Sequence, residues 1–283
     1  MAVVLSTINL KGGVGKSTCT VAIAEMLAAE FRKRVLVIDL DPQTNATTML
    51  IGEDKWKELN KKEHTLARLF QDALVEDRSE RKFDLNKTLQ RGVSNVSAVR
   101  RLDLLPSSLD LIDVQDRLGS MSSGRFHSDV PTDILRRATR GLIEEEEYDY
   151  VLIDCPPNLG IITLNGLRIS DGYIIPTIPD VLSTYGIPQI LTRVEAFAAA
   201  IGEDIDPVGI IISKFRDQST VHHNTIRHLR GGDVYVFETI IPESDKIAAS
   251  AEHEPQNTLR QKYGYAGQFD KYRSLTKEIM EVV

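Results

Sequence analysis

The chain alternates between short apolar runs and longer stretches with helical periodicity. Several apolar runs contain almost no polar residue, which is typical of strands buried on both faces of a parallel sheet. Strands and helices that alternate along one chain predict a doubly wound α/β fold, with a mostly parallel sheet flanked by helices. The expected strands are residues 2–8, 35–39, 102–105, 150–154, 172–178, 208–213 and 234–241, and the expected helices include residues 17–31, 132–147 and 181–200.

One stretch breaks this alternation. Residues 52–99 are rich in charge and only weakly periodic, so we interpret them as a helical insertion or a mobile segment. No internal repeat or low-complexity linker divides the sequence, and 283 residues are enough for one large domain. We therefore expect a single domain over residues 1–283.

A glycine-rich loop joins the first expected strand to the first expected helix. Residues 11–18 read KGGVGKST, and this context is the one that a phosphate-binding P-loop requires. The glycines let the backbone turn tightly and bring N–H groups to phosphate oxygens, and the helix N-terminus adds its positive dipole. Lys16 is placed to meet the β- and γ-phosphates of a nucleotide, and the Ser17 hydroxyl to bind Mg²⁺. The expected nucleotide-binding residues here are Lys11, Gly12, Gly13, Val14, Gly15, Lys16, Ser17 and Thr18.

Three aspartates stand at the carboxyl ends of expected strands. Asp39 and Asp41 follow one buried run, and Asp154 ends the run at 150–154, which has the form of a Walker B strand. In a parallel sheet these ends face the ligand crevice. One acid of the first pair can hold the magnesium shell while the other orients the attacking water. We expect Ser17, Asp39 and Asp154 at the metal.

The loop departs from the usual Walker A pattern, because Leu10 stands where the first glycine belongs. It matches K-G-G-x-x-K-[ST] instead, and residues 39–47 match D-x-D-P-Q-x-N-A-T. Both motifs resemble the ParA family of the ParA/MinD superfamily. Since the ATPase strand begins at residue 2, the resemblance is to the short type that has no N-terminal DNA-binding domain.

The resemblance implies an ATPase that uses ATP and Mg²⁺. It implies that Lys11 reaches the partner's phosphates in an ATP-sandwiched homodimer and that Asp41 is needed for hydrolysis. It also places Pro242 and Glu243 near the base. We expect a ParB-like or adaptor protein to trigger hydrolysis, so that the ATPase segregates or positions a plasmid, a chromosome region or a protein cargo.

The net charge of −7 argues against a generally basic nucleic-acid binder, so contact with nonspecific double-stranded DNA requires a local patch. The candidate residues are Lys214, Arg216, Arg227, Arg230 and Lys246.

No apolar stretch is long enough to span a bilayer, and two cysteines cannot build a disulfide framework. We expect a cytoplasmic, nucleoid-associated protein. Two alternatives stay open: a MinD-like ATPase on a membrane surface, and a metabolic P-loop enzyme of the dethiobiotin-synthetase kind.

Overall fold

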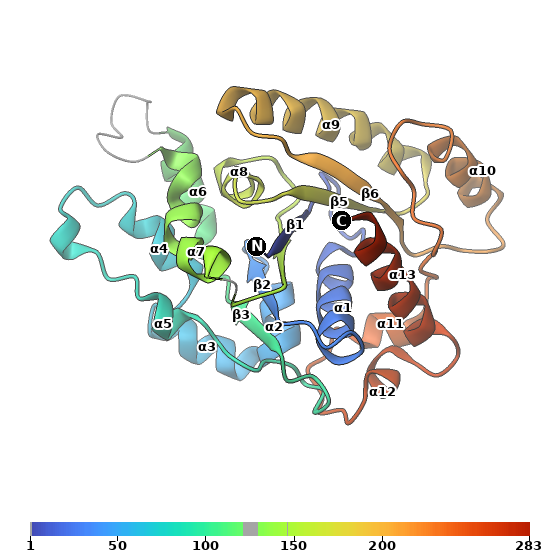
Figure 1. Cartoon of the computed structure of the whole chain (residues 1–283), viewed down its shortest axis with the longest axis horizontal. Coiled ribbons are helices and arrows are strands. Elements are labelled where there is room, and N and C mark those ends of the chain that lie inside the picture. The colour runs from blue at the N-terminus through green and yellow to red at the C-terminus, as the bar shows by residue number, and fades with distance from the viewer. Residues whose placement is uncertain (1, 121–129, 146) are drawn as a thin grey trace.

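A computed structural model describes residues 2–120, 130–145 and 147–283, and six strands within these residues form one sheet. Every strand pair is parallel, and the strand order is β3-β2-β4-β1-β5-β6. Helices cover both faces of the sheet (Figure 1). The predicted doubly wound α/β fold is therefore confirmed. The strands are β1 (Val3–Thr7), β2 (Val35–Asp39), β3 (Leu102–Leu105), β4 (Tyr150–Asp154), β5 (Gly172–Thr177) and β6 (Asp206–Ile212).

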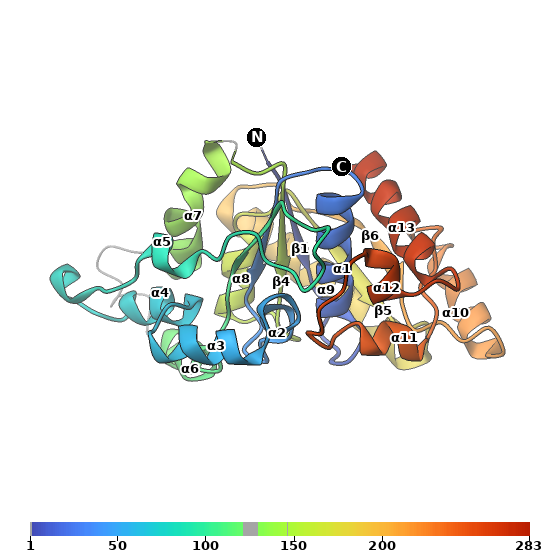
Figure 2. The same ribbon diagram turned by 90° about the horizontal axis from the view of Figure 1, so that it is seen from below.

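Each face of the sheet packs against its own layer of helices. On one face Leu27 of α1 and Leu275 of α13 belong to the same buried cluster, and Figure 2 shows these two helices side by side. On the other face, the buried cluster includes Leu167 of α8 and Ile190 of α9. Burial on both faces explains why β2 and β4 have no exposed residue. The helices are α1 (Lys16–Ala29), α2 (Asn45–Ile51), α3 (Glu53–Lys61), α4 (Leu66–Asp72), α5 (Leu85–Thr88), α6 (Leu111–Ser120), α7 (Ile134–Glu144), α8 (Ile161–Leu167), α9 (Val181–Ile201), α10 (Thr220–Leu229), α11 (Asp245–Ala249), α12 (Leu259–Tyr263) and α13 (Gln268–Val282), with 3₁₀ turns at Arg78–Glu80 and Pro131–Asp133.

The strand expected at 234–241 does not form. This segment runs beside β6, where Val236 makes one isolated parallel bridge to Ile210. The Glu278 carboxylate on α13 accepts hydrogen bonds from the backbone N–H groups of Glu238 and Thr239, at 2.8 and 3.0 Å. Because a side chain satisfies these donors, the ladder of a seventh strand is interrupted.

Residues 52–99 carry the helices α3, α4 and α5. Leu66 and Phe70 of α4 are buried in the cluster that includes Leu135 of α7. The indole N–H of Trp56 donates to the carbonyl of Ser107, just beyond β3. The segment therefore packs beside the β3 edge of the sheet. That the whole chain is a single domain stays a prediction.

Candidate nucleotide site

The P-loop turns sharply between β1 and α1. Gly13 and Gly15 have φ angles of +76° and +86°, in the left-handed region that favours glycine. The Ser213 hydroxyl after β6 donates to the carbonyl of Val14 at 2.7 Å. The buried Asn9 side chain donates to the carbonyl of Pro176 and accepts from the N–H of Lys11. The loop is thus tied to β5 and β6, the strands beyond β1.

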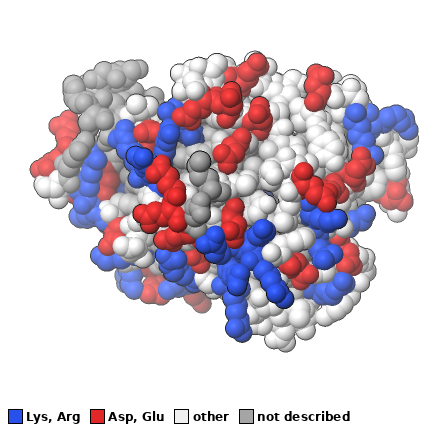
Figure 3. Space-filling view, viewed as in Figure 1, with Lys and Arg blue, Asp and Glu red and all other residues white. Residues whose placement is uncertain are grey.

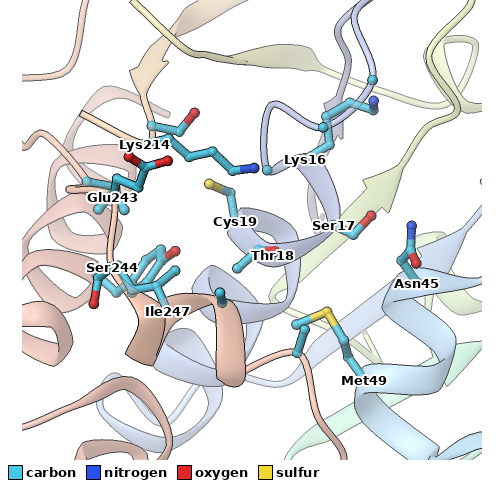
Figure 4. A pocket seen from close by; sticks show the side chains of 18 of the residues that line it. Lys16, Ser17, Thr18, Cys19, Asn45, Met49, Lys214, Glu243, Ser244 and Ile247 are labelled. Atoms are coloured by element: carbon cyan, nitrogen blue, oxygen red, sulfur yellow. The ribbon is translucent and has the colours of Figure 1, made fainter. Parts of the chain in front are cut away.

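A cavity of about 550 Å³ opens at the P-loop, at the carboxyl ends of the strands. Figure 4 shows Lys16, Ser17 and Thr18 at its P-loop side and Asn45 and Met49 of α2 at another wall. The lining also includes Gly12, Gly13, Gly15, Asp41 and Gln43. This volume is in the range of small-molecule sites, and its polar floor has the backbone geometry that suits a phosphate chain.

The two lysines of the motif have different surroundings. Lys16 begins α1, is buried and lines the cavity. Lys11 does not line the cavity. Its Nζ lies 2.9 Å from the Asp180 carboxylate, and both side chains are about one third exposed. Asp180 immediately precedes α9, so the ion pair joins the P-loop to the start of that helix.

Asp39 and Asp41 end up in different environments. The Asp39 carboxylate is buried and accepts from the backbone N–H and hydroxyl of Thr47, at 2.8 and 2.6 Å, and from the N–H of Asp41 at 3.0 Å. Burial raises the pKa of Asp39 to about 7, while the hydrogen bonds from Thr47 oppose the shift. Asp39 does not line the cavity, and its acceptors are occupied by protein donors. These hydrogen bonds tie Asp39 to α2, and its role at the metal stays a prediction.

Asp41 does line the cavity. One of its carboxylate oxygens accepts the N–H of Gln43 at 2.9 Å. Burial raises the pKa of Asp41, and the charge of Lys16 lowers it. The carboxylate stands near the P-loop lysine, where it can accept a hydrogen bond from a water molecule.

Asp154 at the end of β4 is a buried acid whose hydrogen-bonding capacity is not satisfied by the described residues. Both of its carboxylate oxygens lack a hydrogen-bond partner among the described residues. The Ser17 hydroxyl is close enough to lower the pKa of Asp154 but does not meet the geometry of a hydrogen bond. Burial and the neighbouring Asp39 together hold that pKa well above its usual range. A divalent cation or its bound water beside Ser17 would satisfy these oxygens.

These residues fit Mg²⁺ in the way that nucleotide-dependent sites use it. Among the residues that the structure describes, no three His, Cys, Asp or Glu side chains are close enough to hold a metal by themselves. Mg²⁺ in phosphate sites needs no such cage, since it keeps several waters and takes ligands from the phosphates. Ser17 and Asp154 are the residues that could hold it, and it would supply charge neutralisation at the phosphates.

The segment expected near the base forms the far wall of the cavity. Pro242 and Glu243 line it, together with the apolar side chains of Ile247 and Tyr272. Pro242 pairs with Phe215 in an isolated parallel bridge, and the N–H of Glu243 donates to the carbonyl of Phe215. This wall therefore depends on the loop that follows β6.

The five predicted DNA residues have different surroundings. Lys214 has a φ of +48°, and its side chain extends into the cavity above Cys19 (Figure 4). Arg216 forms an ion pair with Glu243 at 2.5 Å, and Arg230 forms one with Glu238 at 2.7 Å. Arg227 donates to Asn224 and Lys246 lies on α11. Lys214 is thus placed to meet a nucleotide, unlike its predicted partners.

Sequence reasoning missed three residues that shape the site: Asn9, Thr47 and Asp180. Thr47 fixes Asp39, Asn9 holds the P-loop, and Asp180 holds Lys11. Asp180 carried a usable signal, because it follows a buried parallel strand at its carboxyl end, as Asp41 does. His222 is also buried, and it accepts the N–H of Arg216 at 3.1 Å.

Comparisons with known proteins agree with this site. A family model described as an AAA domain matches residues 2–206. The chain is 30% identical over 241 residues to the chromosome partitioning protein ParA of Myxococcus xanthus, covering 85% of this chain and 75% of that protein.

Two solved structures share the fold. Cobyrinic acid a,c-diamide synthase from Mycobacterium smegmatis, with bound ADP and magnesium, is 26% identical with a TM-score of 0.72, covering 99% of this chain and 95% of that one. A plasmid partition protein of Borrelia burgdorferi bound to AMPPNP is 20% identical with a TM-score of 0.74, and both chains are covered completely. From the family model, the ParA relative and the deviant P-loop together, the chain belongs to the ParA family of P-loop ATPases.

Proposed function

We propose that this ATPase dimerises around Mg²⁺–ATP, binds double-stranded DNA without sequence preference, and segregates or positions a cargo. A ParB-like or adaptor partner stimulates hydrolysis in this proposal. The observation that carries it is a cavity lined by the deviant P-loop and Asp41, with the unsatisfied carboxylate of Asp154 buried near Ser17 and Lys11 outside the cavity.

The chain's own residues divide the work at the phosphates. ATP, when bound, supplies the phosphoryl group that is transferred to water. The backbone N–H groups of the P-loop and the start of α1 bind phosphate oxygens, and Lys16 neutralises their charge. Ser17 and Asp154 hold Mg²⁺ and its water, and Asp41 accepts a hydrogen bond from the attacking water and orients it.

Dimer formation is supported by the surface next to Lys11. The first turns of α9 expose Val181, Leu182 and Tyr185, with 54%, 74% and 68% of their surfaces accessible. These apolar side chains follow Asp180 directly in the chain. Because Lys11 pairs with Asp180, the lysine and the apolar surface lie in the same region. A second subunit placed here would cover the apolar side chains and receive Lys11 at its own phosphates.

Sedimentation velocity with a slowly hydrolysed ATP analogue tests this proposal. Wild-type protein should change from monomer to dimer with the analogue and Mg²⁺, and should stay monomeric with ADP. Lys11→Ala should still bind the analogue but remain monomeric, because the charge delivered across the interface is lost. Lys55→Ala, an exposed lysine on α3, is the matched control and should dimerise. Dimerisation of Lys11→Ala at wild-type concentrations would overturn the role of Lys11.

DNA binding in this proposal depends on the dimer. In one subunit Arg216 and Arg230 are paired with acids, and the net charge is negative. Two subunits double the basic groups that face one duplex and add avidity. Glu243 lines the cavity and forms an ion pair with Arg216. A nucleotide in the cavity would therefore contact the residue that neutralises this arginine. No feature of α10 suggests base readout, so contacts to phosphates are expected.

The two alternative functions make different predictions. A MinD-like membrane tail needs an apolar helix face at the surface, whereas Phe269, Tyr272 and Leu275 of α13 are buried against α1. No described helix is long and apolar enough to cross a bilayer. The name of the mycobacterial neighbour is that of a metabolic enzyme. An enzyme of this kind should release phosphate only with a small organic co-substrate. The proposed ATPase should release it with DNA and a protein partner.

A further inference from the structure

A second cavity, also of about 550 Å³, lies at the other end of the strands from the P-loop. Its walls come from the last turns of α9, the loop into β6, and Asp233 and Val234 after α10. Tyr173, the second residue of β5, forms its inner wall. The P-loop follows the carboxyl end of β1, whereas Tyr173 stands at the amino end of β5. The two cavities are therefore separate sites.

Acidic side chains surround this second cavity. Glu203 lies 2.8 Å from Arg136 and 3.4 Å from Arg168, so its charge is compensated. The other four acids form no ion pair among the described residues, and no lysine or arginine lines the cavity there. Acidic side chains gather over α9 on the face seen in Figure 3. These four acids are Glu195, Asp204, Asp206 and Asp233.

The second observation is an unpartnered phenol on the inner wall. Tyr173 is only 2% exposed, and its hydroxyl makes no hydrogen bond to any described residue. Two other buried tyrosines do have partners: Tyr148 donates to Asp103, and Tyr263 donates to Glu25. Burial, followed by the charges of Asp206 and Glu195, raises the pKa of Tyr173. The ring is buried, while the hydroxyl is not among the fully enclosed unpartnered atoms of the described residues and so opens to the cavity, where a bound group can meet it.

The arrangement suits an extended organic cation better than a metal ion. No three carboxylates in the described residues come close enough together to coordinate one metal. The acids are instead spread around a wall that includes Leu191, Ala198, Pro207 and the ring of Tyr173. An apolar stem can pack on that wall while its charged end meets carboxylates and the face of the ring.

We propose that this cavity binds an ammonium or guanidinium group carried on an apolar stem, with Asp206, Glu195 and the Tyr173 hydroxyl as its recognition groups. The same chemistry occurs in free diamines and in the lysine or arginine side chains of a partner protein. This site goes beyond the proposed function and does not depend on nucleotide.

Isothermal titration calorimetry on the full chain at constant ionic strength tests the inference. One arm uses putrescine and agmatine, and the other uses an end-blocked Ala-Ala-Lys-Ala peptide. Tetramethylammonium is the control cation, because it has charge but no stem and no donor. Asp206→Asn and Glu195→Gln should each weaken binding by about 5-fold or more, and Tyr173→Phe by about 3- to 10-fold. Asp54→Asn on the distant helix α3 removes one exposed carboxylate and should leave affinity unchanged.

The arms separate the two sources of the cation. Saturable binding of the diamines identifies a small-molecule site, and binding of the peptide alone identifies a side chain of a partner protein. The proposal is overturned if no cation saturates the site more tightly than tetramethylammonium, or if Asp206→Asn and Glu195→Gln bind as wild type does. Folding is checked by ATP binding at the P-loop, which all of these variants should retain.

Discussion

Replacing Asp154 by Asn should raise the stability of the protein while weakening its binding of Mg²⁺ and nucleotide. The Asp154 carboxylate is buried beside Asp39, without a hydrogen-bond partner among the described residues. Asp154→Asn keeps the size of the side chain and removes its charged form. We therefore expect the variant to be more stable than wild type in the absence of nucleotide and Mg²⁺.

The sign of the pH dependence follows from the raised pKa. An acid whose pKa is raised on folding contributes stability that is present at low pH and is lost as the pH rises through the folded-state value. The gain of Asp154→Asn should therefore be close to zero at pH 5 and should grow towards pH 8. Asn keeps a polar group here but stays neutral, so the gain is the cost of holding a charged carboxylate in this position, roughly 1–3 kcal/mol. For a chain of this size that corresponds to a melting temperature higher by roughly 2–6 °C.

Thermal unfolding in EDTA at pH 5 and pH 8 measures this gain. Asp103→Asn is the matched control, because Asp103 is buried but accepts from Tyr148 at 2.7 Å and from the N–H of Gly92 at 2.8 Å. It should lose stability where Asp154→Asn gains. Ligand at 100 times its Kd stabilises a protein by about 2.7 kcal/mol. Wild type should show this increment with Mg²⁺ and an ATP analogue, and Asp154→Asn should show much less.

Two results would refute this reasoning. One is a loss of stability in Asp154→Asn at pH 8, similar to that of Asp103→Asn. The other is an undiminished stabilisation of Asp154→Asn by Mg²⁺ and nucleotide, which would mean that the unsatisfied oxygens do not serve the metal.

Two further predictions concern turnover and DNA. Asp41→Ala should bind ATP and persist as a dimer while hydrolysis falls about 100-fold or more, because the water loses its orienting carboxylate; phosphate release and sedimentation measure this, and normal turnover or a monomer in ATP would contradict it. Replacing Lys246 and Arg216 by Glu should weaken ATP-dependent duplex binding and spare dimerisation. In wild type the logarithm of affinity should fall by roughly 0.9 per neutralised phosphate per log unit of salt. Fluorescence anisotropy checks both, and equal DNA affinity with ADP and ATP would exclude an ATP-switched patch.

The parts of the fold that depend on local pattern could be predicted from the sequence. Six expected strands overlap the observed ones within one or two residues, because runs such as β2 and β4 are apolar up to their final aspartate. The P-loop was predictable because its tight turn needs glycine at positions with positive φ angles, as Gly13 and Gly15 show. That Asp41 and Asp154 lie at the same end of the sheet was predictable because parallel strands bring their carboxyl ends together.

The remainder depends on contacts between distant parts of the chain. The segment 234–241 has a strand-like pattern, but Glu278 from α13 takes two of its backbone donors. The charge of Lys214 suggested a contact with DNA, whereas this residue has a positive φ and lines the cavity. The pattern around Asp39 likewise did not show that Thr47 donates two hydrogen bonds to its carboxylate. In each case the structure depends on a distant contact or a backbone angle that local periodicity does not identify.

The central claim is that the cavity at the P-loop holds Mg²⁺–ATP through Lys16. The most direct measurement is an equilibrium titration of wild type and Lys16→Ala with a fluorescent ATP analogue, in Mg²⁺ and in EDTA. We expect saturable, Mg²⁺-dependent binding by wild type and no measurable binding by Lys16→Ala, because the lysine neutralises phosphate charge in the ground state. Tight binding of the analogue by correctly folded Lys16→Ala would contradict the assignment of this cavity.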